Sequence, residues 1–447
     1  MKLLLVVPAM EKDKKKRLKG KAFRLPQISL GILAALTPKD VFLTYVDENI
    51  EDIDYECGAD LVAITVMTAT APRAYEISQN FKSKGAKVIL GGIHPSILPY
   101  EALRYADSVV IGEAEYVWKK VIEDFKRKEL QPIYYGERVK SDDIISPERE
   151  IFKGKGYFFN SILQATRGCP YECDFCSVSL FFGRSFRTRN IKAIIKEIEE
   201  LNHPLIGFLD DNLMGNKVFA KKLFYELIPL KIRWLGQASL TIADDRELLK
   251  LAKRSGCAGL FIGIESVKES GLKEINKKYQ KAKNLLEKIK IIQEEGILIE
   301  GSFIFGLDSD TQDIFDETLE FVFQSKMALA SFSILTPYPG TKLQKRLQEE
   351  NRIITYDWRL YDCGHAVFKP KNMSIEKLQE GLDYCWYQFY SYKNIFKRVF
   401  SLGYRFPFLG IPLLIINLSY KKMLFKTTEI SSWFSQKNYG YKASETF

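Results

Sequence analysis

The stretch Arg167-Gly-Cys169-Pro-Tyr-Glu-Cys173-Asp-Phe-Cys176 places three cysteines at spacings of four and three residues. It follows a strand predicted at Ser161–Thr166, so it lies on a loop at the carboxyl end of a strand, where barrel folds carry their chemistry. Three thiolates at these spacings can wrap one cube of iron and sulfide. Because Fe–S clusters usually take four cysteine ligands, three leave one iron open to an outside ligand.

Zinc is the competing metal for this motif. A structural zinc site is closed by four ligands, and the motif supplies three. His365 would complete such a set, so zinc stays open as the weaker alternative. The other cysteines are scattered singly along the chain and are expected in hydrophobic cores: Cys57, Cys257, Cys363 and Cys385.

Length and composition indicate a globular protein of more than one domain. The chain has 447 residues, of which 46% are hydrophobic and 27% charged. This composition excludes a disordered chain, a collagen and a coiled-coil rod, and single cores stop growing near about 250–300 residues. The apolar start, Met1–Met10, is too short for a signal peptide, and no stretch reaches the roughly 20 apolar residues of a membrane span. We therefore expect a cytoplasmic protein with reduced thiols.

The first 135 residues alternate strand and helix signals, and the short apolar runs indicate buried parallel strands. Helices are predicted at Leu30–Leu36, Arg73–Ser83 and Trp118–Phe125. Such an alternation predicts a doubly wound, Rossmann-like α/β sheet, which binds ligands beyond the carboxyl ends of its strands. The five predicted strands are Leu3–Val7, Val41–Val46, Leu61–Val66, Lys87–Leu90 and Ser108–Ile111.

A second alternating series follows a polar linker at residues 136–156. Its six β/α units, within residues 157–341, predict a partial barrel short of the eight units of a closed one. Residues 342–447 are predicted to be mostly helical. The six strand signals are Ser161–Thr166, Leu205–Leu209, Trp234–Ala238, Leu260–Ile264, Leu298–Phe305 and Leu329–Leu335.

The cysteine motif, with aromatic Phe175 before its last cysteine, resembles the radical S-adenosylmethionine (radical SAM) superfamily. The resemblance implies that Cys169, Cys173 and Cys176 hold a 4Fe–4S cluster, and that Phe175 belongs to the cofactor site. The amino and carboxylate groups of SAM would chelate the fourth iron. Reductive cleavage would then release a 5′-deoxyadenosyl radical, so the resemblance also implies an electron donor such as flavodoxin or ferredoxin.

Polar residues end the later barrel strands in the order of the superfamily's cosubstrate site. The resemblance implies that Asp210 and Asp211 hold the ammonium group of SAM, since a desolvated charge pair of this kind is strong. It implies contacts to the ribose, carboxylate and adenine from the strands that follow. Each motif is weak alone, but their order after the cysteines makes coincidence implausible. The further candidates are Gln237, Ser239, Glu265, Ser266 and Ser302.

The first unit resembles the cobalamin-binding domain that precedes the radical module in one large subfamily. The matching stretches are Gly91-Gly-Ile-His-Pro-Ser96 and Ile111-Gly-Glu-Ala-Glu115. Many cobalamin proteins carry a cobalt-ligating histidine after the first strand, whereas this chain has Glu11-Lys-Asp-Lys-Lys-Lys16 there. We therefore predict cobalamin without a histidine ligand, and interpret His94 as a locally hydrogen-bonded loop residue. The implied contact residues are Thr65, Thr68, Gly91, Gly92 and Glu113.

The stretches Trp358-Arg-Leu-Tyr-Asp362 and His365-Ala-Val-Phe-Lys-Pro370 resemble subfamily members related to hopanoid methylases and the bacteriochlorophyll ring cyclase. The resemblance implies methyl transfer from cobalamin to an unactivated carbon of a hydrophobic, lipid-like small molecule. Ring formation or another oxidative rearrangement with the same cofactors is the alternative. A tRNA-modifying enzyme and a non-catalytic sensor are weaker hypotheses. The sequence assigns no catalytic side chain beyond the cofactor ligands.

The end of the chain concentrates positive charge. The net charge is +10, and from Lys393 onward nine lysines and arginines face two acids. In Asn394–Leu418 apolar residues recur at near-helical spacing among Lys397, Arg398 and Arg405, until Pro407 and Pro412 interrupt the run. This pattern is typical of a helix lying on a membrane surface. The alternative is that the segment packs against the barrel and closes its open edge. Nucleic acid is the less favoured partner.

Overall fold

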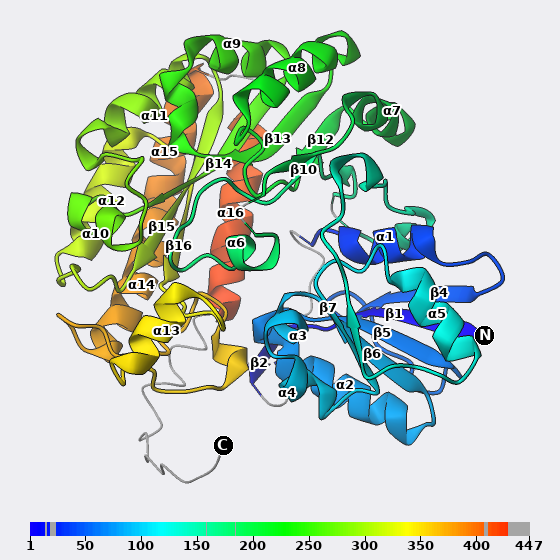
Figure 1. Cartoon of the computed structure of the whole chain (residues 1–447). Coiled ribbons are helices and arrows are strands. Elements are labelled where there is room, and N and C mark those ends of the chain that lie inside the picture. The colour runs from blue at the N-terminus through cyan, green and yellow to red at the C-terminus, as the bar shows by residue number, and fades with distance from the viewer. Residues whose placement is uncertain (14–15, 18–23, 158, 184, 406–409, 428–447) are drawn as a thin grey trace.

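Two parallel sheets, one in each half of the chain, form the framework of the computed structural model (Figure 1). The structure describes residues 1–13, 16–17, 24–157, 159–183, 185–405 and 410–427. The C-terminal helices lie against the second sheet. Within the described part of the chain, no helix is both long enough and apolar enough to cross a bilayer.

The first sheet has six parallel strands in the order β4-β1-β5-β6-β7-β8. The apolar runs that predicted five of them are buried, so the doubly wound α/β prediction is confirmed. The sixth strand, β8, was not predicted because its apolar run is only three residues long. The strands are β1 (Lys2–Val7), β4 (Phe42–Asp47), β5 (Leu61–Thr65), β6 (Lys87–Gly91), β7 (Ser108–Ile111) and β8 (Ile133–Tyr135).

Helices cover both faces of this sheet (Figure 1). They are α1 (Ile28–Leu36), α2 (Ala71–Ser83), α3 (Ile93–Ile97), α4 (Pro99–Leu103) and α5 (Trp118–Lys126). A short antiparallel hairpin of β2 (Glu11–Asp13) and β3 (Lys16–Arg17) follows β1.

The segment at residues 136–156, predicted to be a polar linker, packs against the first sheet. Val139, Ile144 and Phe152 are buried, and the Phe152 ring meets Tyr45 edge-on at 5.3 Å between centroids. Sparse apolar residues in a polar stretch gave no periodic signal. The domain limits themselves stay a prediction.

The second sheet has six parallel strands in the order β16-β15-β14-β13-β12-β9. In the described residues its two edge strands do not pair with each other, so the sheet is a partial barrel, as predicted. Its strands are β9 (Ile162–Leu163), β12 (Leu205–Phe208), β13 (Arg233–Ala238), β14 (Cys257–Glu265), β15 (Leu298–Phe305) and β16 (Leu329–Ile334). Its outer helices are α7 (Ile191–Leu201), α8 (Lys217–Leu227), α9 (Arg246–Arg254), α10 (Glu269–Glu274), α11 (Leu285–Glu294) and α12 (Ile314–Ser325).

The predicted helical C-terminal region is confirmed, and it covers the β16 edge of the barrel. The indole N–H of Trp386 donates to the Phe332 carbonyl at 2.9 Å, and the Tyr420 hydroxyl donates to Glu300 Oε1 at 2.9 Å. An uncovered edge strand would invite pairing with another chain, so these helices remove that hazard. They are α13 (Lys342–Glu349), α14 (Ile375–Phe389), α15 (Tyr392–Arg405) and α16 (Gly410–Thr427).

Helix α15 turns one face to the protein and the other to solvent. Ile395 and Leu402 are buried, and so is Arg398, whose guanidinium stacks on the Phe389 ring at 3.7 Å and donates to Asn417. Burial lowers the pKa of Arg398 to about 10. Arg398 therefore belongs to the packed face and not to a basic flank. Pro407 and residues 428–447 lie outside the described part of the chain.

Candidate cofactor sites between the two sheets

The three cysteines lie on a loop that leaves a short two-stranded ribbon. The ribbon pairs β10 (Thr166–Arg167) with β11 (Arg187–Thr188), and α6 (Ser177–Phe181) follows the loop. At its start Gly168 has φ +85°, and a Cβ there would lie 2.3 Å from the Ser185 carbonyl oxygen. Only glycine therefore fits between ribbon and loop. We call residues 168–176 the cluster loop.

Two segments hold the cluster loop from outside, one from the barrel unit and one from the C-terminal region. Asn276 donates to the Glu172 carbonyl at 2.8 Å, and Leu343 N–H donates to the Asp174 carbonyl at 3.0 Å. The rings of Tyr171 and Tyr279 stack with centroids 3.7 Å apart. These contacts fix the loop without using the cysteine side chains.

The cysteine thiols are partly buried and favour their neutral form. Burial raises the pKa of Cys169 and Cys176, and raises that of Cys173 to about 12 although nearby Lys277 opposes this. Within the described residues, no three His, Cys, Asp or Glu side chains converge on a single ion position. An Fe–S cluster takes each thiolate on a separate iron and displaces its proton, so soft donors spread along a loop fit a cluster better than one ion.

Asp210, directly after β12, holds the ribbon in place. Its carboxylate is fully buried and accepts hydrogen bonds from Ala165 N–H at 3.1 Å, from Thr166 N–H, and from the Thr166 hydroxyl at 2.6 Å. Burial raises its pKa to about 7, against the hydrogen bonds that lower it. Asp210 therefore has a structural role, because its oxygens accept hydrogen bonds from the segment that leads into the cluster loop.

Asp211 is the member of the acidic pair that lies toward the cluster loop. Its carboxylate is half-buried and accepts from Gly168 N–H at 3.3 Å, and burial raises its pKa. The amide of the next residue, Asn212, approaches Cys169 Sγ at 3.9 Å. The prediction that both carboxylates bind the SAM ammonium group stays open, and the observed contacts favour Asp211 for it.

The other predicted cosubstrate residues lie on or directly after β13, β14 and β15. Ser239 shares a hydrogen bond with Thr241, which in turn meets the Tyr171 hydroxyl at 3.3 Å. Ser266 accepts from Lys268 N–H at 3.1 Å and so begins the turn into α10. Gln237 and Ser302 are half-buried on β13 and β15, and Phe175 packs against the barrel core.

Lys277 is a residue of this site that sequence reasoning missed. Its ammonium is 5% exposed and pairs with Glu265 at 2.7 Å, and it also donates to the Gly263 carbonyl at 2.7 Å. Glu265 has φ +66°, a left-handed conformation that costs energy for a residue other than glycine. The pair holds Glu265 beside the cluster loop. The run Asn276-Lys-Lys-Tyr279 gave no signal because its spacing is that of an ordinary charged surface turn.

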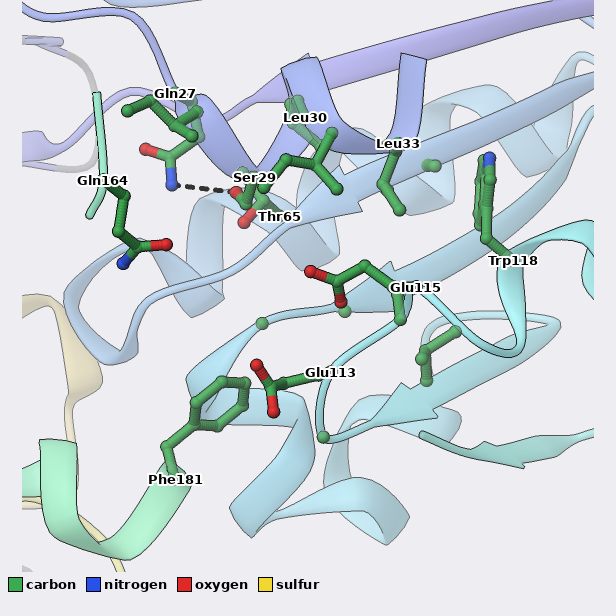
Figure 2. A pocket seen from close by; sticks show the side chains of 18 of the residues that line it. Gln27, Ser29, Leu30, Leu33, Thr65, Glu113, Glu115, Trp118, Gln164 and Phe181 are labelled. Atoms are coloured by element: carbon green, nitrogen blue, oxygen red, sulfur yellow. Dashed lines mark hydrogen bonds between the residues drawn. The ribbon is translucent and has the colours of Figure 1, made fainter. Parts of the chain in front are cut away.

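A cavity of about 330 Å³ opens at the carboxyl edge of the first sheet (Figure 2). Its floor comes from α1 and the ends of β5, β6 and β7, and its far wall comes from the barrel unit. Four of the five predicted cobalamin contacts line it, namely Thr65, Gly91, Gly92 and Glu113. Gly92 has φ +105°, and a Cβ would approach the Val66 backbone to 2.8 Å. Backbone can therefore come close to a ligand here.

The fifth predicted contact, Thr68, lies behind this cavity and not in its lining. Its hydroxyl meets His94 Nδ1 at 3.4 Å, and His94 Nε2 meets the Tyr75 hydroxyl at 3.1 Å and Glu101 at 3.3 Å. Glu101 also accepts from the Trp358 indole at 2.9 Å. His94 is thus buried in a hydrogen-bonded cluster, which agrees with the prediction of local hydrogen bonds. The prediction of a loop is wrong, because His94 lies in α3.

Glu113 joins the cavity wall to the cluster loop. Its two carboxylate oxygens bind Arg167 at 2.6 Å and Arg187 at 2.5 Å, the two paired residues of the ribbon. Arg167 also binds Glu115 at 2.6 Å. All four side chains are at most 10% exposed. The first sheet is therefore tied by buried charge to the residue that begins the cluster loop.

Sequence comparison matches three parts of the chain to known families. The Radical SAM superfamily matches residues 163–322, the B12 binding domain residues 24–122, and a Domain of unknown function (DUF4070) residues 341–406. Bacteriochlorophyllide d C-12(1)-methyltransferase of Chlorobaculum tepidum is 32% identical over 83% of this chain and 84% of that protein. The chain belongs to the cobalamin-binding radical SAM family.

Two further proteins similar to this chain are named for other reactions. The hopanoid C-2 methylase of Rhodopseudomonas palustris is 29% identical over 76% of this chain and 67% of that protein. The anaerobic magnesium-protoporphyrin IX monomethyl ester cyclase of Cereibacter sphaeroides is 28% identical over 80% of this chain and 64% of that protein. The solved structure of the cobalamin-dependent radical enzyme OxsB shares the fold, with a TM-score of 0.68 at 16% identity over 97% of this chain and 72% of that chain.

As a member of this family, the enzyme uses a 4Fe–4S cluster, SAM and cobalamin. The donor set of the cluster loop suits the cluster, and the glycine-edged cavity suits a ligand that lies against backbone. The particular residues that hold each cofactor stay a prediction.

Replacing Asp210 with alanine will destabilise the apo protein by about 2–4 kcal/mol, because two buried N–H groups and a hydroxyl lose their acceptor. Asp210→Asn keeps a carbonyl oxygen and will retain most of the stability. Asp211→Ala loses one weak contact and will cost about 1 kcal/mol or less. Urea unfolding gives the order of the three variants. An Asp211→Ala variant as unstable as Asp210→Ala would contradict the distinction between them.

Removing the Glu113 carboxylate will leave Arg187 without its carboxylate partner. Breaking a buried ion pair typically costs about 3–5 kcal/mol, so Glu113→Ala will unfold at much lower urea than Glu115→Ala, in which Arg167 keeps Glu113. The double variant Glu113→Ala with Arg187→Met will be less unstable than the sum of the single variants. Hydrogen exchange should accelerate at residues 165–168 and 187–189 in Glu113→Ala. If the losses of unfolding free energy in the two single variants added exactly to that of the double variant, Glu113 would not hold the ribbon through Arg187.

Proposed function

We propose that this enzyme transfers a methyl group to an unactivated carbon of a hydrophobic, lipid-like small molecule. When bound, SAM on the cluster supplies a 5′-deoxyadenosyl radical, and cobalamin carries the methyl group. The observation that carries the proposal is the cavity whose floor comes from the cobalamin unit and whose far wall comes from the residues beside the cluster loop. Both cofactors would then face one substrate.

The chain's own residues would orient the cofactors and exclude water. Glu113 and Glu115 point into the cavity from the loop after β7, and Phe181 of α6 faces them from the barrel side (Figure 2). Phe182 and Leu209 continue this apolar wall. A reactive radical needs such an apolar wall, because the wall excludes solvent and so prevents side reactions.

A hydrophobic substrate is supported by the relatives. Their names specify a bacteriochlorophyllide and a hopanoid, which are large and mostly apolar molecules. The cyclase relative keeps ring formation as the alternative with the same cofactors. We favour methyl transfer because the relative that is 32% identical is named a methyltransferase.

Methyl transfer is distinguished from ring formation by its products. The anaerobically reconstituted enzyme, with cobalamin, SAM, dithionite and either bacteriochlorophyllide d or a lipid extract, should form 5′-deoxyadenosine and S-adenosylhomocysteine together with a methylated product. Cys173→Ala should lose all three products but keep its fold. Formation of 5′-deoxyadenosine with an oxidised or cyclised product and no S-adenosylhomocysteine would favour the alternative.

We further propose that the solvent face of α15 and α16 rests on a membrane surface that supplies the substrate. Phe400 is 84% and Ile411 75% exposed, and Phe396 and Ile415 are each 56% exposed. Exposed Lys393 and Lys397 lie on the same helix as the phenylalanines. An apolar face with basic neighbours suits an anionic lipid surface, where each nearby lysine contributes about 1 kcal/mol.

This membrane hypothesis is tested without truncating the chain, because α15 and α16 also cover the barrel edge. Phe396→Glu with Phe400→Glu should abolish flotation with vesicles of phosphatidylglycerol and leave thermal unfolding unchanged. A double charge reversal at exposed positions of α7 and α8, Lys192→Glu with Lys222→Glu, should float as the parent does. If the parent protein fails to float at low salt, the surface-binding hypothesis is wrong.

A further inference from the structure

We propose that a lysine-rich surface over the cluster loop is the docking face for a small acidic electron-transfer protein of the flavodoxin kind. The inference rests on the radical SAM chemistry of the proposed function, since that chemistry needs one electron delivered to the cluster. We call this surface the lysine face. Its exposed members are Lys273, Lys278, Lys281, Lys283, Lys342 and Lys345.

The lysine face lies directly over the cluster loop. Its first part belongs to α10 and the turn that follows, where Asn276 is bonded to Glu172 and the Ile275 carbonyl accepts from Asp174 N–H at 3.3 Å. Its second part belongs to α13, where Lys342 pairs with Glu172 at 2.8 Å. Both parts therefore touch the stretch between the first and last cysteines of the motif.

Two other sides of the cluster loop are closed to a protein partner. On one side lie Asp210 and Asn212, both at most 3% exposed in the barrel core. On another, Arg167 is buried against Glu113 in the wall of the cobalamin cavity. The segment that carries Tyr279, whose ring stacks on Tyr171 in the loop, therefore offers a packed route from the lysine face to the loop.

The positive charge of the lysine face favours an acidic partner. Residues 269–283 and 342–346 together contain eight lysines and arginines, of which Lys277 is buried, and two acids. Much of this charge is compensated. Glu269 pairs with Lys281 at 3.5 Å and with Lys273 at 4.0 Å. Lys342 pairs with Glu172 at 2.8 Å, and Arg346 pairs with Asp308 at 2.7 Å and with Glu274 at 3.2 Å. Lys278, Lys283 and Lys345 have no carboxylate at ion-pair distance among the described residues. Such a surface attracts an acidic protein and raises its association rate by about 10–10³-fold at low ionic strength.

The test follows reduction of the cluster itself, so that it does not depend on substrate turnover. In stopped-flow experiments at low salt, flavodoxin hydroquinone should bleach the reconstituted cluster at least about tenfold more slowly in the triple variant K278E/K283E/K345E than in the parent. Dithionite, a small reductant that needs no docking face, should reduce both proteins at the same rate. Raising the ionic strength should slow the parent and bring the two flavodoxin rates together.

The matched control carries the same charge change elsewhere. In K192E/K222E/K250E the reversed lysines are exposed on α7, α8 and α9, which lie together at the far end of the barrel from α13 (Figure 1). This variant should be reduced by flavodoxin within about twofold of the parent rate. Equal slowing of both triple variants, or no slowing of either, would overturn the docking face.

The two proposals fail separately. If dithionite reduces the cluster but no methylated product forms, the proposed function is wrong and the docking result still stands. If methyl transfer proceeds with dithionite and the lysine face variant accepts electrons from flavodoxin as fast as the parent, only the docking face is wrong. Cobalamin binding and thermal unfolding should match in all three proteins, because the reversed lysines touch no cofactor residue.

Discussion

The ion pairs of Glu113 with Arg167 and Arg187 are the constraint on which the rest of the structure depends. Taking charges out of water costs several kcal/mol per ion, so a buried group of this kind is stable only when its charges are matched and its geometry is good. Here two carboxylates, counting Glu115, meet two guanidinium groups. The match fixes one orientation of the first sheet against the ribbon, which hydrophobic contact alone would leave freer to slide.

That orientation decides where the chemistry can occur. The ribbon ends at the cluster loop, and Glu113 also forms part of the cavity at the edge of the first sheet. A second attachment runs from His94 and Glu101 to Trp358, in the part of the chain that matches a family of unknown function. Two attachments at separate points prevent rotation of one unit about the other. The C-terminal region thus contributes to the relative placement of both cofactor sites as well as covering the barrel edge.

Sequence alone predicted the parts of the fold that repeat and missed those that depend on contacts between distant residues. Continuous apolar runs predicted both sheets. Strand β8 was too short to be predicted, and the burial of Phe152 was not predicted because it lies in a polar stretch. The cysteine spacing predicted the cluster loop. Pattern could not show that Asp210 would serve the ribbon backbone, or that Lys277 would be buried beside Glu265, because burial of a charge is decided by which segments meet in space.

Helix α15 shows that sequence also fails to predict which charged side chains are exposed. The basic tail suggested that its arginines face an anionic surface, yet Arg398 is buried on Phe389 and bonded to Asn417. A guanidinium can do this because it is weakly hydrated and stacks on aromatic rings. The net charge of the tail therefore overestimated the positive charge that α15 exposes to a partner. The opposite holds for the turn after α10, whose lysines gave no signal in the sequence and yet form an exposed positive surface beside the cluster loop.

Under the two proposals, the enzyme would take electrons from a protein in water and substrate from a lipid phase, so it would have to keep the two surfaces apart. The lysine face belongs to α10, the turn that follows it, and α13, whereas the exposed apolar residues belong to α15 and α16. The two proposed surfaces therefore share no helix, which a carrier and a membrane bound at the same time would require. The surfaces also differ in chemistry: attraction through lysines weakens with salt, whereas insertion of phenylalanine and isoleucine into a headgroup layer does not. Under these proposals, ionic strength would act on electron supply more strongly than on the apolar part of membrane contact.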